Sequence, residues 1–202
     1  MRFFQSKSRF QIKGDRNHLR SEEELTAIDK NAADEAFKKY KKILDEYLMA
    51  NGFAKYKTNA YVRRNQADLL EQIDLQKERY GSKTFTVNYS IMPLYAPYDH
   101  IYNINMGDRL GTLVCRKDVW WDYADDQAAE ISFQNVTDAI GRFVFPWFEK
   151  YENEDFLKEE LSKRKKVRWL DLLENCTDRE VVIAENIEKL KLPKKIGKAV
   201  ER

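Results

Sequence analysis

Residues 84–91 constrain the fold of this chain more than any other segment. Four apolar side chains alternate there with four polar ones, in the order Thr84, Phe85, Thr86, Val87, Asn88, Tyr89, Ser90 and Ile91. Successive side chains of a strand point to opposite faces, so this period of two predicts a strand with one apolar and one polar face. Such a strand needs neighbouring strands and an apolar layer, and the segment therefore predicts a sheet.

The preceding residues supply the neighbouring strands. In residues 69–76 the apolar Leu69, Ile73 and Leu75 share one parity, and the polar Gln72, Asp74 and Gln76 share the other. Residues 79–82 predict a turn in which Gly81 is free to adopt a positive φ. Residues 60–64 predict a third strand. The expected product is an antiparallel sheet with one apolar face and one face of amides, hydroxyls and a carboxylate.

A helix is predicted before the strands. Ser21 and Glu24 fit a capping box, and an apolar stripe at spacings of three and four continues to Asn51. Gly52 is suited to end this helix.

Shorter elements are predicted after the strands. Residues 92–100 form a tyrosine-rich loop interrupted by prolines, and residues 102–105 and 109–114 predict short strands. Residues 117–122 predict a turn.

Helical patterns return in the last third of the chain. A helix capped at Asn135 or Thr137 must kink or restart at Pro146, and residues 156–165 predict another helix. Residues 177–180 resemble a capping box that opens a helix ending before residue 193. This order of elements predicts an α+β fold, an antiparallel sheet packed on one face by helices, with additional C-terminal helices.

Composition and charge indicate a folded chain in three parts. The 202 residues are 43% hydrophobic and 35% charged, which is typical of a globular protein. Residues 1–20 carry six Lys and Arg against Asp15 alone and predict a basic arm. Residues 21–160 are acidic on balance and predict the α+β core domain. Residues 161–202, with twelve Lys and Arg against seven acidic residues, predict a helical extension packed on or beside that domain.

Several classes of site are not expected. The two cysteines, Cys115 and Cys176, lack the spacing of a metal site, and no catalytic or phosphate-binding motif is present. We therefore expect no catalytic residue, no metal and no cofactor. Cys115 is predicted to lie buried in a strand, and Cys176 lies beside a predicted helix start. No apolar run approaches the roughly 18 residues of a membrane span, and no secretory leader is evident, so we expect a cytoplasmic protein.

Five segments in a fixed order carry a family resemblance. They are residues 48–63, 70–77, 85–88, 109–111 and 146–151, which include a Gly-Phe helix end, a Tyr-x-Arg strand and a Pro-Trp-Phe segment. In this order they resemble the bacterial family known as domain of unknown function 4304, over roughly residues 34–160. The resemblance implies a cytoplasmic bacterial α+β domain and carries no functional residue with it. The basic first twenty residues and the tyrosine-rich loop depart from the family pattern.

The polar face of the predicted sheet is the preferred candidate for a binding surface. An ordered strand presents hydrogen-bonding side chains at little entropic cost, and Arg and Tyr are common anchors of protein interfaces. The candidate residues are Tyr61, Arg63, Gln72, Asp74, Gln76, Arg79, Asn88 and Arg109. The hypothesis is a non-catalytic protein-interaction module with a regulatory or immunity-like role. The plainer alternative is an antiparallel sheet whose polar face is simply exposed to solvent.

Two other functions remain open. Nucleic-acid binding through the basic ends is suggested by residues 163–169, a basic run ending in Trp169, although a solvated charged helix explains the same pattern. A small enzyme or ligand-binding site is suggested by Asp99 beside His100, with Arg109 nearby in sequence. The aromatic residues Trp120, Trp121, Tyr95, Tyr98 and Tyr102 fit either ligand stacking or a cap on the core.

Overall fold

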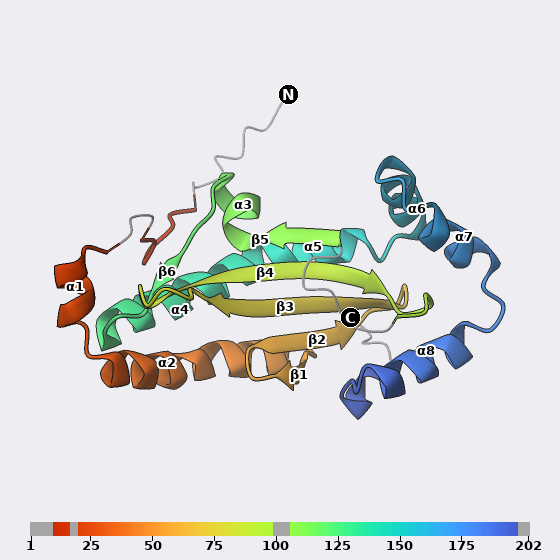
Figure 1. Ribbon diagram of the computed structural model, residues 1–202. Coiled ribbons are helices and arrows are strands. Elements are labelled where there is room, and N and C mark those ends of the chain that lie inside the picture. Colours follow the sequence, from red (N-terminus) through yellow and green to blue (C-terminus); the bar gives the residue numbers. More distant parts are fainter. Residues whose placement is uncertain (1–9, 17–19, 99–105, 198–202) are drawn as a thin grey trace, which may run out of the picture.

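A six-stranded antiparallel sheet lies at the centre of the chain (Figure 1). The computed structural model describes residues 10–16, 20–98 and 106–197. The strands are β1 (Ala54–Lys57), β2 (Ala60–Arg64), β3 (Leu69–Lys77), β4 (Thr84–Pro93), β5 (Met106–Arg109) and β6 (Trp121–Asp122). They are ordered β1-β2-β3-β4-β5, with β6 paired to β4 beyond the end of β5.

The hairpin of β3 and β4 is the longest pairing in the sheet. Nine residue pairs join the strands, from Leu69 opposite Pro93 to Lys77 opposite Phe85. The predicted turn between them is confirmed, with Gly81 at a φ of 91° that favours glycine. On the other side of β3, Tyr61 of β2 lies opposite Ile73, which fixes the faces of β2 as well.

Helices precede and follow the strands, which confirms the α+β class. They are α1 (Glu22–Ala27), α2 (Lys30–Ala50), α3 (Leu110–Cys115), α4 (Asp126–Ala139), the π-helix η1 (Ile140–Val144), α5 (Phe145–Lys150), α6 (Glu154–Lys163), α7 (Val167–Asn175), α8 (Arg179–Lys189) and the 3₁₀-helix η2 (Lys194–Gly197). The Ser21–Glu24 capping box is confirmed. Gly52 follows α2 with a φ of 86°, in agreement with its predicted role.

The main core lies between the sheet and the helices α2 and α4. The apolar parity of β3 and β4 faces these helices, and α4 lies behind the sheet in Figure 1. Phe133 of α4 stacks on Phe85 of β4 at 4.8 Å between ring centroids, and Phe37 of α2 packs edge-on to Phe133 at 5.2 Å. Burial of these large rings provides much of the free energy that holds the layers together.

The opposite side of the sheet, which we call the front face, is turned toward the viewer in Figure 1. It has two halves. Near the end of β4 an apolar half, with Val62, Leu70 and Met92, is covered by α8 and η2. Toward the start of β4 the side chains are polar, and Figure 1 shows none of the described helices over them. The front face is therefore divided between a packed end and a polar end.

Several predicted elements differ from the structure. The helix predicted to be capped at Asn135 or Thr137 begins at Asp126, where Asp125 caps it, and the predicted turn over residues 117–122 ends in β6. The strand predicted over residues 102–105 lies outside the described residues.

The predicted strand over residues 109–114 is wrong, because α3 begins directly after β5. Gly111 permits this helix to pack closely, since a Cβ there would lie 2.5 Å from the carbonyl oxygen of Lys117. The helix predicted to run from Ser21 to Asn51 is interrupted between α1 and α2, where Asp29 caps a new start. The predicted capping box at residues 177–180 is also absent, because Asp178 makes no side-chain cap bond.

Part of the predicted basic arm is docked on the domain. The backbone N–H of Asp122 donates to Gly14 O at 2.8 Å, and the N–H of Arg16 donates to Trp120 O at 2.8 Å. Asn135 of α4 holds the same segment through Lys13 N and Gln11 O. Residues 10–16 therefore extend the sheet edge beside β6, while residues 1–9 lie outside the described part of the chain.

A buried ion pair lies inside the helix-covered face. Arg63 of β2 donates from Nε to Glu71 Oε2 of β3 at 2.6 Å, and the two side chains are 4% and 0% exposed. Asn65 Nδ2 donates to the other carboxylate oxygen at 3.2 Å. The guanidinium also lies over the Phe53 ring at 4.4 Å. Each charge thus has partners that offset its desolvation.

We predict that Glu71→Ala lowers the free energy of unfolding by about 3–5 kcal/mol, because it leaves the Arg63 charge buried without its carboxylate. Urea denaturation followed by circular dichroism measures the change. Glu23→Ala, in the exposed first turn of α1, is the control and is expected to change stability by no more than about 0.5 kcal/mol. Equal effects of the two substitutions would show that the buried pair adds nothing to the fold.

Candidate functional site

A set of polar side chains on β3 and β4 forms the candidate site. Directly opposed residues of an antiparallel pair point to the same face, and the register places Gln72 opposite Ser90, Asp74 opposite Asn88 and Gln76 opposite Thr86. We call this set the polar row and define it as Gln72, Asp74, Gln76, Thr84, Thr86, Asn88 and Ser90. All its members lie on the front face, opposite to the core of α2 and α4.

The polar row is much less exposed than a solvated sheet face. Thr86 is 0% exposed, Ser90 1% and Asn88 2%, whereas Asp74 and Gln76 are half-buried. The expectation that this face is simply wetted by solvent is therefore not met at its centre. A buried hydroxyl or amide costs free energy unless it is hydrogen-bonded, so the partners of these groups decide what the row can do.

Three polar atoms of β4 lack a hydrogen-bond partner. They are Thr86 Oγ1, Asn88 Oδ1 and Ser90 Oγ, and no described residue donates to or accepts from them. They occupy alternate positions of one strand and therefore the same face. Each such atom costs about 1–3 kcal/mol relative to a satisfied one. The front face thus holds a short line of unused hydrogen-bonding capacity.

Asp74 adds a carboxylate to this line. Asn88 Nδ2 donates to Asp74 Oδ2 and to Gln76 Oε1, both at 3.3 Å. Burial raises the pKa of Asp74, and the hydrogen bond from Asn88 and the charge of Lys57 oppose that rise without cancelling it. Asp74 is therefore held at a free-energy cost when it is ionised.

Basic side chains flank the polar row on both sides, in the direction across the strands. Lys57 pairs with Ala60, Ala60 with Asp74, and Asn88 with Arg109. Arg109 makes an ion pair with Asp118, and its guanidinium lies 5.3 Å from the centre of the half-buried Trp120 ring. The predicted position of Arg109 beside the polar row is thus observed. The carboxylate of Asp74 and the amide of Asn88 therefore lie between the cations Lys57 and Arg109.

Two of the predicted rim residues lie elsewhere. Tyr61 and Arg63 point to the helix-covered face, because Tyr61 is paired with Ile73 and Arg63 with Glu71. Tyr61 is fully buried and donates to Asp45 of α2, and Arg63 belongs to the buried ion pair. These two residues therefore do not border the polar row. Arg79 is exposed in the turn between β3 and β4.

Lys57 is not among the residues predicted to border the polar row, because no strand was predicted over residues 54–57. The signal was present, since Thr58 and Asn59 form a two-residue polar connection of the kind that joins hairpin strands. Trp120 and Asp118 were assigned to a turn without their contact to Arg109. That contact joins residues on either side of α3 and depends on where α3 returns the chain.

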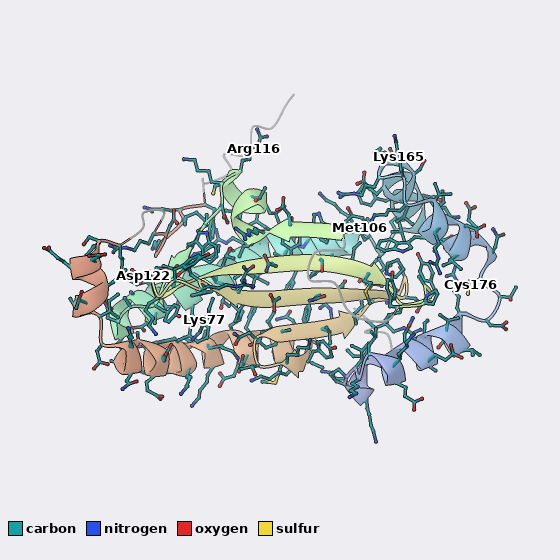
Figure 2. The ribbon with its side chains drawn as sticks, in the orientation of Figure 1. Lys77, Met106, Arg116, Asp122, Lys165 and Cys176 are labelled. Carbon is teal, nitrogen blue, oxygen red and sulfur yellow. The ribbon has the colours of Figure 1, made fainter. Side chains whose placement is uncertain are left out.

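The cysteine predictions are corrected by the structure. The expectation of a buried Cys115 is wrong, because it is exposed at the end of α3 and its Sγ donates to Gly111 O at 3.3 Å. Cys176 ends α7 and lies two residues before Asp178, the N-cap of α8, on the connection of the two helices (Figure 2).

The remaining candidates give less support for a site. Asp99, His100 and Tyr102 lie outside the described residues. Trp121, Tyr95 and Tyr98 are buried, as in the alternative in which they cap the core. In the basic run, Lys163 and Arg164 pair with glutamates of their own helix, in agreement with a solvated charged surface.

The described residues contain neither a candidate metal site nor a candidate membrane span. No group of three or more His, Cys, Asp or Glu residues is close enough there to hold a metal ion. Within the same residues, no helix is both long and apolar enough to cross a membrane.

Comparison with known proteins gives one match. The model of the family described as Domain of unknown function (DUF4304) matches residues 44–150, just over half of the chain. No curated protein and no solved structure matches. The matched segment contains all six strands and ends with α5, so it includes the polar row but not α6, α7 or α8.

We predict that Asp74→Asn stabilises the protein at pH 7. The raised pKa means that the folded state favours the protonated carboxyl, so stability is lost as pH rises from the unfolded value near 3.8 through the folded value. The asparagine side chain of the variant does not ionise, so the variant does not lose stability in this way. Its stability advantage over the wild type should vanish below pH 3.8. Urea denaturation from pH 3.5 to 7 measures the difference.

Asp34→Asn is the control of opposite sign. Although burial raises the pKa of Asp34, hydrogen bonds from Lys83 and Lys77 outweigh it and lower the pKa. This variant should therefore be less stable than the wild type at pH 7, with the difference fading at acid pH. A stability gain for Asp34→Asn, or no gain for Asp74→Asn, would contradict the stated directions of the two pKa shifts.

Proposed function

The chain belongs to the family of domain of unknown function 4304, and we propose that it is a non-catalytic binding domain whose polar row hydrogen-bonds to a protein partner. The proposed role is regulatory or immunity-like, meaning that binding itself is the activity. The observation that carries the proposal is the line of three unpartnered atoms on β4: Thr86 Oγ1, Asn88 Oδ1 and Ser90 Oγ.

The cost of this line supports a binding role. Each of the three unpartnered atoms costs about 1–3 kcal/mol of stability. That is a large part of the free energy of unfolding of a typical domain, which is on the order of 5–15 kcal/mol. Valine or alanine at Thr86 and Ser90 would fold the same strand without that cost. Sites that sacrifice stability in this way are typical of functional surfaces.

The spacing of the line supports a protein rather than a small molecule. Alternate residues of a strand lie roughly 7 Å apart on one face, and an extended segment or a second strand repeats its groups at the same interval. Two cavities in the described part of the chain lie away from the row, between residues 10–16 and α4. A partner that covers the row also meets Lys57 and Arg109 on either side of it, and these charges would orient the partner.

We place this activity in the cytoplasm, and the two cysteines support that location. Cys115 and Cys176 are both free thiols, and Cys115 is exposed. Free exposed thiols persist most readily in a reducing compartment.

The alternative functions lack a comparable observation. In the nucleic-acid hypothesis, Lys163 and Arg164 are already engaged by Glu159 and Glu160. In the enzyme hypothesis, the described member of the proposed group, Arg109, is paired with Asp118. Both functions stay predictions from the sequence.

We predict that Thr86→Val raises the free energy of unfolding by about 1–3 kcal/mol, because it removes an unsatisfied hydroxyl without changing side-chain shape. Thr84→Val is the matched control on the same strand and face. Thr84 Oγ1 shares a hydrogen bond of 2.8 Å with Ser82 Oγ, so its loss should destabilise the protein. Thermal denaturation at one pH compares the two variants.

The same variants test binding. Affinity capture from cells that encode the protein should recover a partner with the wild type and Thr84→Val, and lose it with the combined Thr86→Val and Ser90→Ala substitutions. Asp74→Arg and Gln76→Arg, at the half-buried border of the row, should also lose it. A partner retained equally by the row variants, or destabilisation by Thr86→Val, would contradict the proposed function.

A further inference from the structure

The C-terminal helix α8 covers a surface of the sheet in the manner of a bound ligand. It lies outside the family-matched segment, which ends at residue 150. Its apolar side chains belong to a second hydrophobic cluster, separate from the core between the sheet and α2 and α4. The strand residues in this cluster are Val62, Leu70 and Met92, which form the apolar half of the front face.

The apolar contact uses one stripe of the helix. Ile183 is 1% exposed and Leu190, at the helix end, is 5% exposed, and Leu192 and Ile196 continue the contact through η2. Val181, on the other side of α8, is 57% exposed. This is the pattern of an amphipathic helix laid into an apolar surface.

An amide makes the contact specific. Asn186 Nδ2 donates to the carbonyl oxygens of Leu94 and Ala96, both at 2.7 Å, and Asn186 Oδ1 accepts from Tyr98 N at 3.3 Å. These backbone groups follow β4, where the chain has left the sheet ladder. Asn186 is 3% exposed, so its amide satisfies three buried backbone groups that would otherwise lack partners.

We propose that the apolar half of the front face is a binding site for an amphipathic helix. In this chain α8 and η2 fill the site, and a helix from a protein partner fills it when α8 leaves. The partner helix must match α8: an amide side chain at the position of Asn186, an apolar side chain three residues before it and another four residues after it.

The attachments of α8 allow it to leave the site. It is tied to the sheet by the apolar stripe, by Asn186 and by the bond from Tyr56 OH to Leu190 O at 3.0 Å. Its ion pair to the sheet joins the buried Arg64 to Glu180, whose side chain is 77% exposed, and Arg64 keeps Asp68 as a partner at 2.5 Å when that pair opens. Because α8 lies outside the main core between the sheet, α2 and α4, we expect it to open at a lower free energy than the core strands do.

The position of the site links it to partner binding. Leu70 lies opposite Met92, and this pair is two residues along β3 and β4 from the pair of Gln72 and Ser90, on the same face of the sheet. A protein that docks on the polar row therefore reaches the edge of α8. Such a partner could present both an extended segment for the row and a helix for the apolar half.

The test uses the full chain and a labelled synthetic peptide of residues 179–197. In the full chain, Ile183→Asp with Leu190→Asp removes the native stripe while leaving the sheet intact, and Val181→Asp is the control on the exposed side of the same helix. Fluorescence polarisation should show the native peptide binding at least ten-fold tighter to the double variant than to the wild type or the control. A peptide with Asn186→Ala should bind at least ten-fold weaker than the native peptide.

Equal binding to all three chains, or equal binding of the two peptides, would overturn the inference. So would a double variant that no longer unfolds cooperatively, since α8 would then be part of the folding unit. Hydrogen exchange on the wild type gives a second reading, in which α8 amides should exchange at least ten-fold faster than those of β3 and β4. Thr86→Val should leave peptide binding unchanged, so failure at the polar row and failure at the helix site are separable.

Discussion

Nine consecutive residue pairs hold β3 against β4, and both faces of the sheet follow from that register. If β4 slipped by one residue against β3, Val87 would turn to the front and Asn88 would enter the core, while β3 kept its faces. The aromatic packing of Phe85 on α4 exists only in the observed register. The same pairing that builds the core therefore also assembles the polar row, because a strand cannot fix one face without fixing the other.

The two faces treat buried polar groups differently. Behind the sheet, Arg63 and Glu71 enter the core with partners on both sides of the pair, and Asn65 completes the network. On the front, Thr86 and Ser90 are buried to the same degree without partners. Folding alone explains the first arrangement, since it closes its own hydrogen bonds. The second leaves three polar atoms of β4 without a hydrogen-bond partner among the described residues.

The sequence predicts those parts of the fold that depend on local periodicity. The alternation of residues 84–91 identified β4 and its faces, and Gly81 identified the turn. The five residues of β2 do not show on which face of the sheet Tyr61 and Arg63 lie, because that depends on the pairing of Tyr61 with Ile73. A signal did exist in Glu71, a charge at the apolar parity of β3, which requires a buried cation nearby. The helix at residues 110–115 depends on close packing of Gly111, which is a tertiary contact.

The family-matched segment and the C-terminal helices meet on one continuous surface. If a chain of this kind ended at residue 150, the apolar half with Val62, Leu70 and Met92 would face water, together with the free backbone groups of Leu94 and Ala96. Exposure of a contiguous apolar patch is unfavourable and marks interaction sites. In this chain α8 and η2 keep that patch out of water. The front face therefore has unpartnered polar atoms toward the start of β4 and an apolar surface covered by α8 and η2 toward its end.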